Sequence, residues 1–196
     1  MESFEQFVAV AMEAEGFIVS SAIKFPVQRQ TRKMIHSETQ THGYEVDLVA
    51  ARSDRLVLAT VKSFFGSRGV AAEHVTGVST NVRSNNLYLL LNDPVIRDAV
   101  VTAAAERYGY PVDQVTVRFY VGRFAGPTKG AHEAKIRQWC SDQRVGGGPI
   151  EVYGLDDVVA AVRKAAASKT YRDNPVLVTL KVLEAAGHLS VGEDEP

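Results

Sequence analysis

The pattern of apolar and polar positions predicts that the chain begins with an amphipathic helix. Apolar side chains recur at helical spacing over residues 3 to 15, with Ser3 as the expected cap and Gly16 as the stop. The apolar positions are Phe4, Phe7, Val8, Ala11 and Met12. A helix with one apolar face is expected to pack on the rest of the fold through that face.

Three strands are predicted to follow this helix. The segments are rich in Val and Ile and are separated by polar or turn-forming stretches; they cover residues 17 to 31, 43 to 52 and 55 to 64. Ser53 and Asp54 form the expected tight turn between the second and third strands. The second and third strands are therefore expected to pair as a hairpin.

The remainder alternates between helical and strand patterns. Residues 68 to 83 have a helical pattern, the apolar run Leu87 to Leu91 predicts a buried strand, and Asp93-Pro94 opens a helix through Tyr108. Further strands are expected over residues 115 to 124 and 150 to 153, and further helices over 132 to 143, 155 to 167 and 174 to 188. This order predicts an α/β fold, with a mixed sheet flanked by helices.

We interpret residues 1 to 196 as one domain. The chain shows no internal repeat and no linker long enough to separate two domains. Residues 1 to 91 form the expected core, and residues 92 to 196 form a C-terminal α/β extension with the last helices. That last helix, over 174 to 188, is expected to cap the fold or to pair two subunits as a homodimer.

Composition indicates the cellular location of the protein more clearly than it indicates its binding partners. The chain has 196 residues, 45% hydrophobic residues and a formal net charge of -1, which are typical of a globular protein. Cys140 is its one cysteine, so neither an internal disulfide nor a cysteine zinc site is possible. Because the N-terminus is acidic and no apolar run reaches the roughly 20 residues of a membrane span, we expect a cytoplasmic protein.

The candidate chemistry lies on the second and third predicted strands. Glu45 and Asp47 are two residues apart on one strand, so their carboxylates are expected on the same face. Thr60 and Lys62 share a face of the next strand, and the hairpin is expected to bring Lys62 near Asp47. Charged groups within such apolar strands are costly unless they are paired or used.

The core of the PD-(D/E)XK superfamily, the restriction-endonuclease-like nucleases, is a helix with an acidic residue, then strands bearing Asp and an acid-x-Lys motif, then a helix and a strand. The chain resembles this core. The resemblance covers residues 1 to about 91. It implies that Asp47 binds a metal, that Lys62 is the motif lysine and that Glu5 is the acid of the first helix. The implied cofactor is Mg²⁺ or Mn²⁺, and the implied activity is hydrolysis of DNA phosphodiester bonds by an endonuclease or exonuclease.

The chain departs from the family pattern at position 60, where Thr60 replaces the motif acid. Glu45, on the face of Asp47, and Glu73, on the following helical segment, are the two candidate substitutes for that metal ligand. Lys62 is expected to help deprotonate or orient the attacking water, or to stabilise the charge of the transition state. Carboxylate oxygens suit either metal.

Basic residues are concentrated in the first part of the chain. Arg29, Arg32, Lys33 and Arg68 are the candidate contacts to a phosphate backbone, which makes DNA the expected partner. The sequence Gly126 to Gly130 lacks the Gly-Lys-Ser/Thr ending of a phosphate-binding loop, so no nucleotide cofactor is indicated.

Two alternatives to a nuclease remain open on the sequence. Thr60 keeps open a catalytically impaired module of the same fold that binds nucleic acid or a protein partner. An interaction protein, structural or of the toxin–antitoxin type, would be indicated by an exposed apolar face on the last helix.

Overall fold

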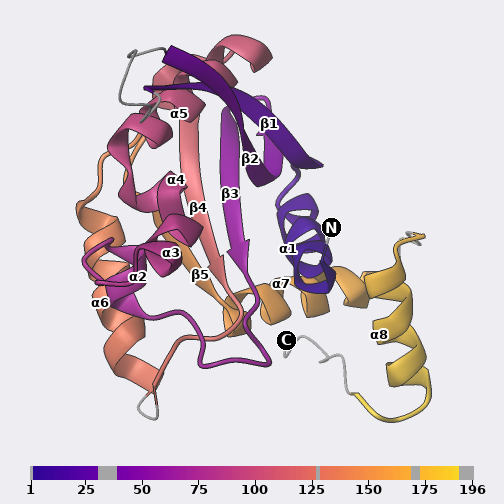
Figure 1. Cartoon of the computed structure of the whole chain (residues 1–196). Helices are drawn as coiled ribbons and strands as arrows, with labels where there is room; N and C mark the ends of the chain where they lie inside the picture. The colour runs from indigo at the N-terminus through magenta and orange to yellow at the C-terminus, as the bar shows by residue number, and fades with distance from the viewer. Residues whose placement is uncertain (1, 31–38, 127–128, 169–172, 190–196) are drawn as a thin grey trace.

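The computed structural model describes residues 2–30, 39–126, 129–168 and 173–189, and these residues form an α/β fold built on a five-stranded mixed sheet (Figure 1). The strands lie in the order β1-β2-β3-β4-β5. Their bounds are β1 Ile18–Gln30, β2 Thr39–Arg52, β3 Arg55–Lys62, β4 Val115–Val121 and β5 Glu151–Gly154. The predicted α/β class, with a mixed sheet flanked by helices, is confirmed.

The sheet changes from antiparallel to parallel pairing at β3. β1, β2 and β3 form an antiparallel meander, and the predicted Ser53-Asp54 turn joins β2 to β3. β4 and β5 then add in parallel to β3, each after a connection that contains a helix. Both halves of the chain therefore contribute strands to the same sheet.

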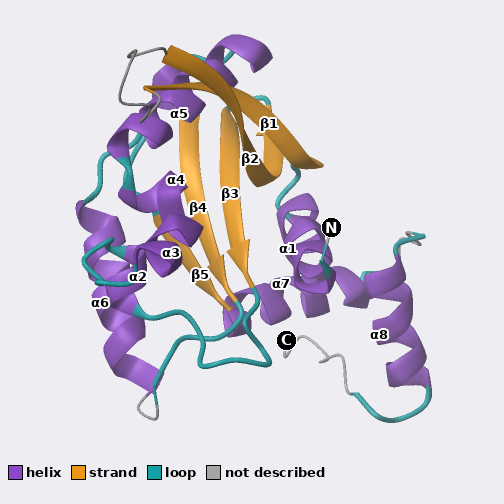
Figure 2. Cartoon of the chain, viewed as in Figure 1, coloured by secondary structure: helices purple, strands orange, loops and turns teal. Residues whose placement is uncertain are grey.

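Helices cover both faces of the sheet (Figure 2). One face carries α1 (Ser3–Ala14), α7 (Leu155–Ala167) and α8 (Pro175–Ala185). The other carries α5 (Pro94–Tyr108) and α6 (Lys129–Asp142), together with three short helices: α2 (Ala72–Val75), α3 (Val82–Asn85) and α4 (Leu89–Asn92). This arrangement agrees with the expectation that the parallel strands of a sheet are packed against helices on both faces.

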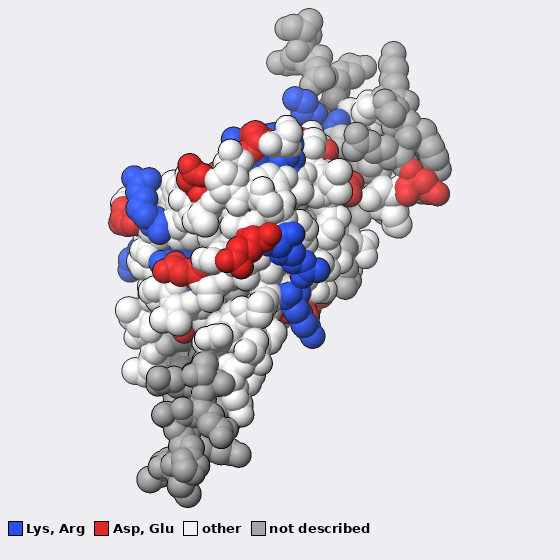
Figure 3. Space-filling view, turned by 90° about the horizontal axis from the view of Figure 1, so that it is seen from above, with Lys and Arg blue, Asp and Glu red and all other residues white. Residues whose placement is uncertain are grey.

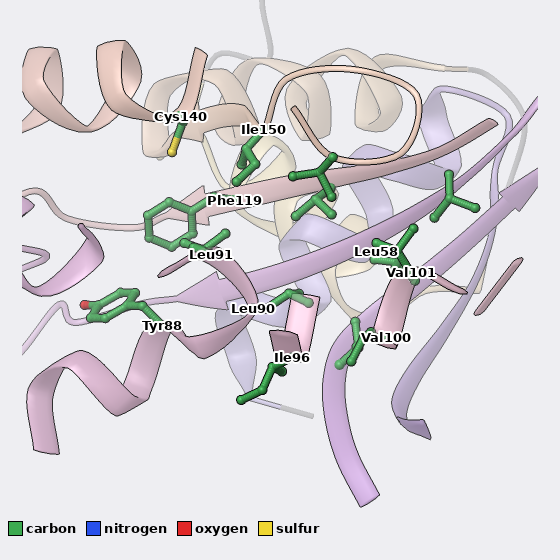
Figure 4. Close-up of a cluster of buried hydrophobic side chains, with 14 of the residues drawn as sticks. Leu58, Tyr88, Leu90, Leu91, Ile96, Val100, Val101, Phe119, Cys140 and Ile150 are labelled. Carbon is green, nitrogen blue, oxygen red and sulfur yellow. The ribbon is translucent and has the colours of Figure 1, made fainter. Parts of the chain in front are cut away.

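The larger core lies between the sheet and helices α4, α5 and α6 (Figure 4). Leu58 and Phe119 contribute to this core from the sheet. Leu91 of α4 and Ile96 and Val100 of α5 contribute to it from the helices. Cys140 of α6 is buried here, and this burial raises the pKa of its thiol to about 12. The residue therefore packs as a small apolar group.

The second core joins α1 and α7 to the opposite face of the sheet. Val8 and Met12 of α1 are fully buried there against Leu48 and Val57 of the sheet. α1 begins with a capping box in which the backbone N–H of Glu2 donates to Oε2 of Glu5, 2.9 Å away. The helix cap is therefore Glu2 and not Ser3 as the sequence suggested.

The predicted strand at Leu87–Leu91 is wrong. Residues Asn86–Tyr88 form a short 3-10 turn and Leu89–Asn92 form α4, with Leu90 and Leu91 buried against the sheet. A short apolar run does not distinguish a buried strand from a buried helix. The parallel neighbour of β3 is instead β4. The expected order of helix, three strands, helix and strand is therefore complete at Val121 and not at about residue 91.

The predicted helix over residues 68 to 83 is also wrong in extent. Only Ala72–Val75 and Val82–Asn85 are helical, separated by a turn at Gly77, whose φ is +77°. Helices α5 and α7 match their predicted bounds. Among the residues that the structure describes, no helix is both long and apolar enough to cross a membrane.

Candidate functional site

Asp47 lies where β2 and β3 separate. The regular pairing of the two strands ends at Leu48 and Ala59, and beyond it the side chain of Asp47 bridges them. Its Oδ2 accepts hydrogen bonds from the backbone N–H of Val61 at 2.7 Å and from the hydroxyl of Thr60 at 3.1 Å. The carboxylate is therefore fixed by the strand that carries the motif lysine.

Lys62 ends β3 beside this carboxylate. Its Nζ lies 3.7 Å from Oδ2 of Asp47, and the two side chains are 21% and 22% exposed. The backbone carbonyl of Lys62 accepts a hydrogen bond from the N–H of Gly122, at 2.8 Å, which ties the end of β3 to the segment after β4. The proximity of Lys62 and Asp47 expected from the hairpin is confirmed, and their partial burial weakens screening by salt.

A pocket of about 840 Å³ opens in front of this pair. Its charged lining comes from β2, from the end of β3 and from the start of α1: Glu2, Glu5, Glu45, Asp47 and Lys62. The segment Ser63 to Ser67 closes another side. The four residues predicted to be catalytic on α1, β2 and β3 all line this one pocket. They are Glu5, Glu45, Asp47 and Lys62.

The acids of the pocket differ in how firmly they are held. Oε2 of Glu45 lies 3.7 Å from Nζ of Lys24 on β1, in a pair whose side chains are 50% and 67% exposed. Such exposed pairs contribute about 0–1 kcal/mol, so Glu45 can turn toward a ligand at little cost. Glu5 is half-buried and is engaged through Oε2 in the helix cap described above.

Glu73, the other candidate substitute for the missing acid, lies elsewhere. It sits on α2, outside the lining of the pocket, with Oε2 3.7 Å from Nδ1 of His132 on α6. The same Nδ1 accepts a hydrogen bond from the backbone N–H of Ala72 at 3.1 Å. The structure therefore brings Glu45, and not Glu73, to the pocket of Asp47.

Thr60 takes a role that its position in the sequence did not reveal. The side chain is buried, and its hydroxyl donates to Asp47 rather than facing the pocket as a ligand. Among the described residues, all the contacts of the Asp47 carboxylate end on Oδ2. Oδ1 is therefore the oxygen of Asp47 that is available to a ligand.

Backbone strain is concentrated at the pocket. Among the described residues, Ala22 and Phe64 are the non-glycine residues with positive φ, at 54° and 46°. Both line the pocket, and Ala22 lies opposite Asp47, between the pairs Ser21 with Leu48 and Ile23 with Val46. A left-handed residue costs roughly 1–2 kcal/mol, and such strain often marks functional sites. No sequence signal identified these two positions.

The predicted contacts to nucleic acid are only partly described. Arg32 and Lys33 and the side chain of Arg29 lie outside the described residues, and Arg68 is exposed in the segment after β3. On the face shown in Figure 3, acidic and basic side chains lie side by side, without a continuous basic area. The charge of this one face therefore does not by itself indicate a nucleic-acid interface.

The donor set of the pocket fits a hard divalent cation by its chemistry. Oδ1 of Asp47 and the carboxylate of Glu45 are the oxygen donors that Mg²⁺ or Mn²⁺ prefers, with Glu5 beside them. Among the described residues, however, no three His, Cys, Asp or Glu side chains are gathered closely enough to hold a metal ion. Binding would require Glu45 to leave Lys24 and turn inward.

Comparison with models of known protein families finds no match to this chain, and comparison with curated proteins finds none either. The interpretation of the pocket therefore depends on the fold and on the residues described above.

Proposed function

We propose that this protein is a metal-dependent nuclease of the PD-(D/E)XK type that hydrolyses DNA phosphodiester bonds. The observation that carries the proposal is the Asp47–Lys62 pair, 3.7 Å apart, at a pocket that Glu45 and Glu5 also line. The order of helix, three antiparallel strands, helix and parallel strand supports it, because that superfamily places its motif residues on the corresponding strands.

In this proposal the scissile phosphate lies in the pocket beside Lys62. The ammonium group of Lys62 is 21% exposed and 3.7 Å from Asp47, so it can stabilise the negative charge that develops on the phosphate. Asp47 and Glu45 would hold Mg²⁺ or Mn²⁺, whose chemistry is to neutralise phosphate charge and acidify water. Thr60 and the N–H of Val61 keep the Asp47 carboxylate oriented toward the pocket.

The second candidate is a module of the same fold that binds nucleic acid or a protein partner without cutting. Thr60 favours it, because the motif acid is replaced by a hydroxyl that is already used by Asp47. In the pocket, Asp47 is the firmly oriented carboxylate, whereas the family motif would supply a second one at position 60. A binding module needs no convergence of acids on a metal, so the two candidates differ in what metal does to the protein.

Cleavage by the purified full chain separates the candidates. Supercoiled, linear and single-stranded DNA would be incubated with Mg²⁺ or Mn²⁺ and, in parallel, with EDTA. The nuclease predicts cutting that requires the metal and is lost in Asp47→Asn. Salt-sensitive DNA binding without cutting, equal in metal and in EDTA, would establish the binding module instead.

A further inference from the structure

The segment Ser63 to Gly69 forms a platform beside the candidate site. It leaves the carboxyl end of β3 at the lower edge of the sheet in Figure 1 and is tied at both ends to the segment after β4. At the first end, the N–H of Gly122 donates to the carbonyl of Lys62 at 2.8 Å. At the second, the N–H of Val70 donates to the carbonyl of Arg123 at 2.8 Å.

Phe65 stands on this platform with half of its surface exposed. Its ring contacts that of Phe4 edge to face, with centroids 5.3 Å apart. A Cβ at position 122 would approach the ring to 2.8 Å, so glycine is required there for the ring to lie against the end of β4. An exposed phenylalanine alone needs no explanation, but this one is held in place from two sides.

Phe65 borders two pockets. It lines the candidate nuclease pocket and also a second pocket of about 730 Å³. The second pocket lies beyond the carboxyl ends of β4 and β5 and is also lined by Arg123 and by Leu155 at the start of α7. The side chain of Arg123 is exposed, and its Nη1 donates to the carbonyl of Phe65 at 3.4 Å.

We propose that Phe65 stacks on an unpaired base next to the scissile phosphodiester, so that the strand at the site is single-stranded. This inference rests on the proposed nuclease function and specifies its substrate. A base within a duplex has both faces covered by its neighbours, so only an unpaired or terminal base can offer a face to the ring. Arg68, exposed on the platform, and Arg123, exposed beside it, supply positive charge for the backbone that continues past the ring.

The second pocket itself is not favourable to a phosphate. Arg137 lines it, but that guanidinium already contacts Glu133 at 2.8 Å and Asp157 at 3.4 Å. With Arg123 and Asp156 included, the lining carries three acidic and two basic side chains. Its net charge is therefore negative, which disfavours a phosphate within it.

Binding measured without metal tests the stacking separately from cutting. The full chain, in EDTA, would be titrated into a short single-stranded DNA that contains one 2-aminopurine, and into the matching duplex. Phe65→Ala is compared with Phe65→Trp, which keeps an aromatic face, and with Leu87→Ala, which shortens another exposed apolar side chain (52% exposed) that lines neither pocket.

The proposal predicts tighter binding of the single strand than of the duplex, with quenching of the 2-aminopurine. Phe65→Ala should weaken single-strand binding roughly five- to a hundredfold, while Phe65→Trp and Leu87→Ala retain it. Unchanged affinity and quenching in Phe65→Ala, or equal binding of the duplex, would overturn the stacking role and leave the nuclease proposal intact. Absence of single-strand binding by the unmodified chain in EDTA would likewise overturn the stacking role, while metal-dependent cleavage alone decides the nuclease proposal.

Discussion

At the scale of single residues, the orientation of Asp47 is the feature on which the candidate site depends. Three groups converge on its Oδ2: the N–H of Val61, the hydroxyl of Thr60 and the ammonium of Lys62. Charge-assisted hydrogen bonds of this kind are about twice as strong as neutral ones. One oxygen is thereby fixed, and the side chain lines the pocket with its other oxygen outside these contacts.

Removing the hydroxyl of Thr60 should loosen this arrangement. Thr60→Val keeps the shape of the side chain but leaves Asp47 one donor short, so we expect the free energy of unfolding to fall by about 1–2 kcal/mol. Thr60→Ser retains the donor and should lose less. Urea unfolding of the two variants measures the difference; equal losses would show that the hydroxyl does not hold Asp47.

Restoring an acid at position 60 should make the pocket respond to metal. In Thr60→Asp, a second carboxylate is placed beside Asp47 in a buried position, so like-charge repulsion should destabilise the fold in EDTA. Mg²⁺ should then recover stability, because a ligand that binds only the folded state stabilises it. The measurement is the melting temperature against Mg²⁺ concentration, with Thr60→Asn as the uncharged control. A melting temperature independent of Mg²⁺ in Thr60→Asp would argue against a metal site.

At the scale of elements, the sequence predicts regular segments well where a boundary residue acts locally. α5 begins after Asp93, whose side chain accepts from the N–H groups of Val95 and Ile96, and ends before Gly109 with φ +74°. Those signals are visible in the sequence. The apolar run at residues 87 to 91 has no such signal, and its helical state is decided by packing on the sheet.

The candidate site follows the same division. The closeness of Asp47 and Lys62 follows from a hairpin whose turn, and the strand ends at Arg52 and Arg55 that flank it, can be predicted from the sequence. The roles of Thr60, Ala22 and Phe64 cannot, because they depend on where β2 and β3 separate. The sequence also offers Glu73 as a candidate, slightly less favoured than Glu45, and the position of α2 puts it outside the pocket.

The left-handed conformation of Ala22 on β1 provides a test of strain at the site. Ala22→Gly removes the Cβ that makes a φ of 54° unfavourable, so we expect a gain of roughly 1 kcal/mol in the free energy of unfolding. Ala51→Gly, in the regular part of β2, should instead lose roughly 0.5–1 kcal/mol. Denaturant unfolding compares them, and a loss in both variants would show that Ala22 is not strained.

At the scale of the whole molecule, Arg118 links the first helix to the strands of the second half. It is 4% exposed on β4, with its guanidinium 3.0 Å from Glu15 after α1 and 2.8 Å from Glu151 on β5. The guanidinium also packs over the ring of Tyr153, 5.0 Å from its centroid. The cluster therefore connects the element that carries Glu5 to the parallel half of the sheet.

Breaking this cluster should destabilise the entire fold. Arg118→Ala leaves the carboxylates of Glu15 and Glu151 without their partner, and because these side chains are 38% and 33% exposed we expect a loss of about 1–3 kcal/mol. Arg144→Ala, which removes an exposed arginine, should change stability by less than about 0.5 kcal/mol. Thermal unfolding followed by circular dichroism measures both, and a similar small effect in the two variants would contradict a structural role for Arg118.

The measurement that tests the central claim most directly is the rate of metal-dependent DNA cleavage by Lys62→Ala, set against the unmodified chain and Lys164→Ala. Lys164 lies on the exposed side of α7, so its removal controls for the loss of a lysine. If Lys62 acts on the scissile phosphate, Lys62→Ala should lower the cleavage rate at least about 100-fold. Its melting temperature, and the cleavage rate of Lys164→Ala, should stay close to those of the unmodified protein. Cleavage by Lys62→Ala at the unmodified rate would contradict the account.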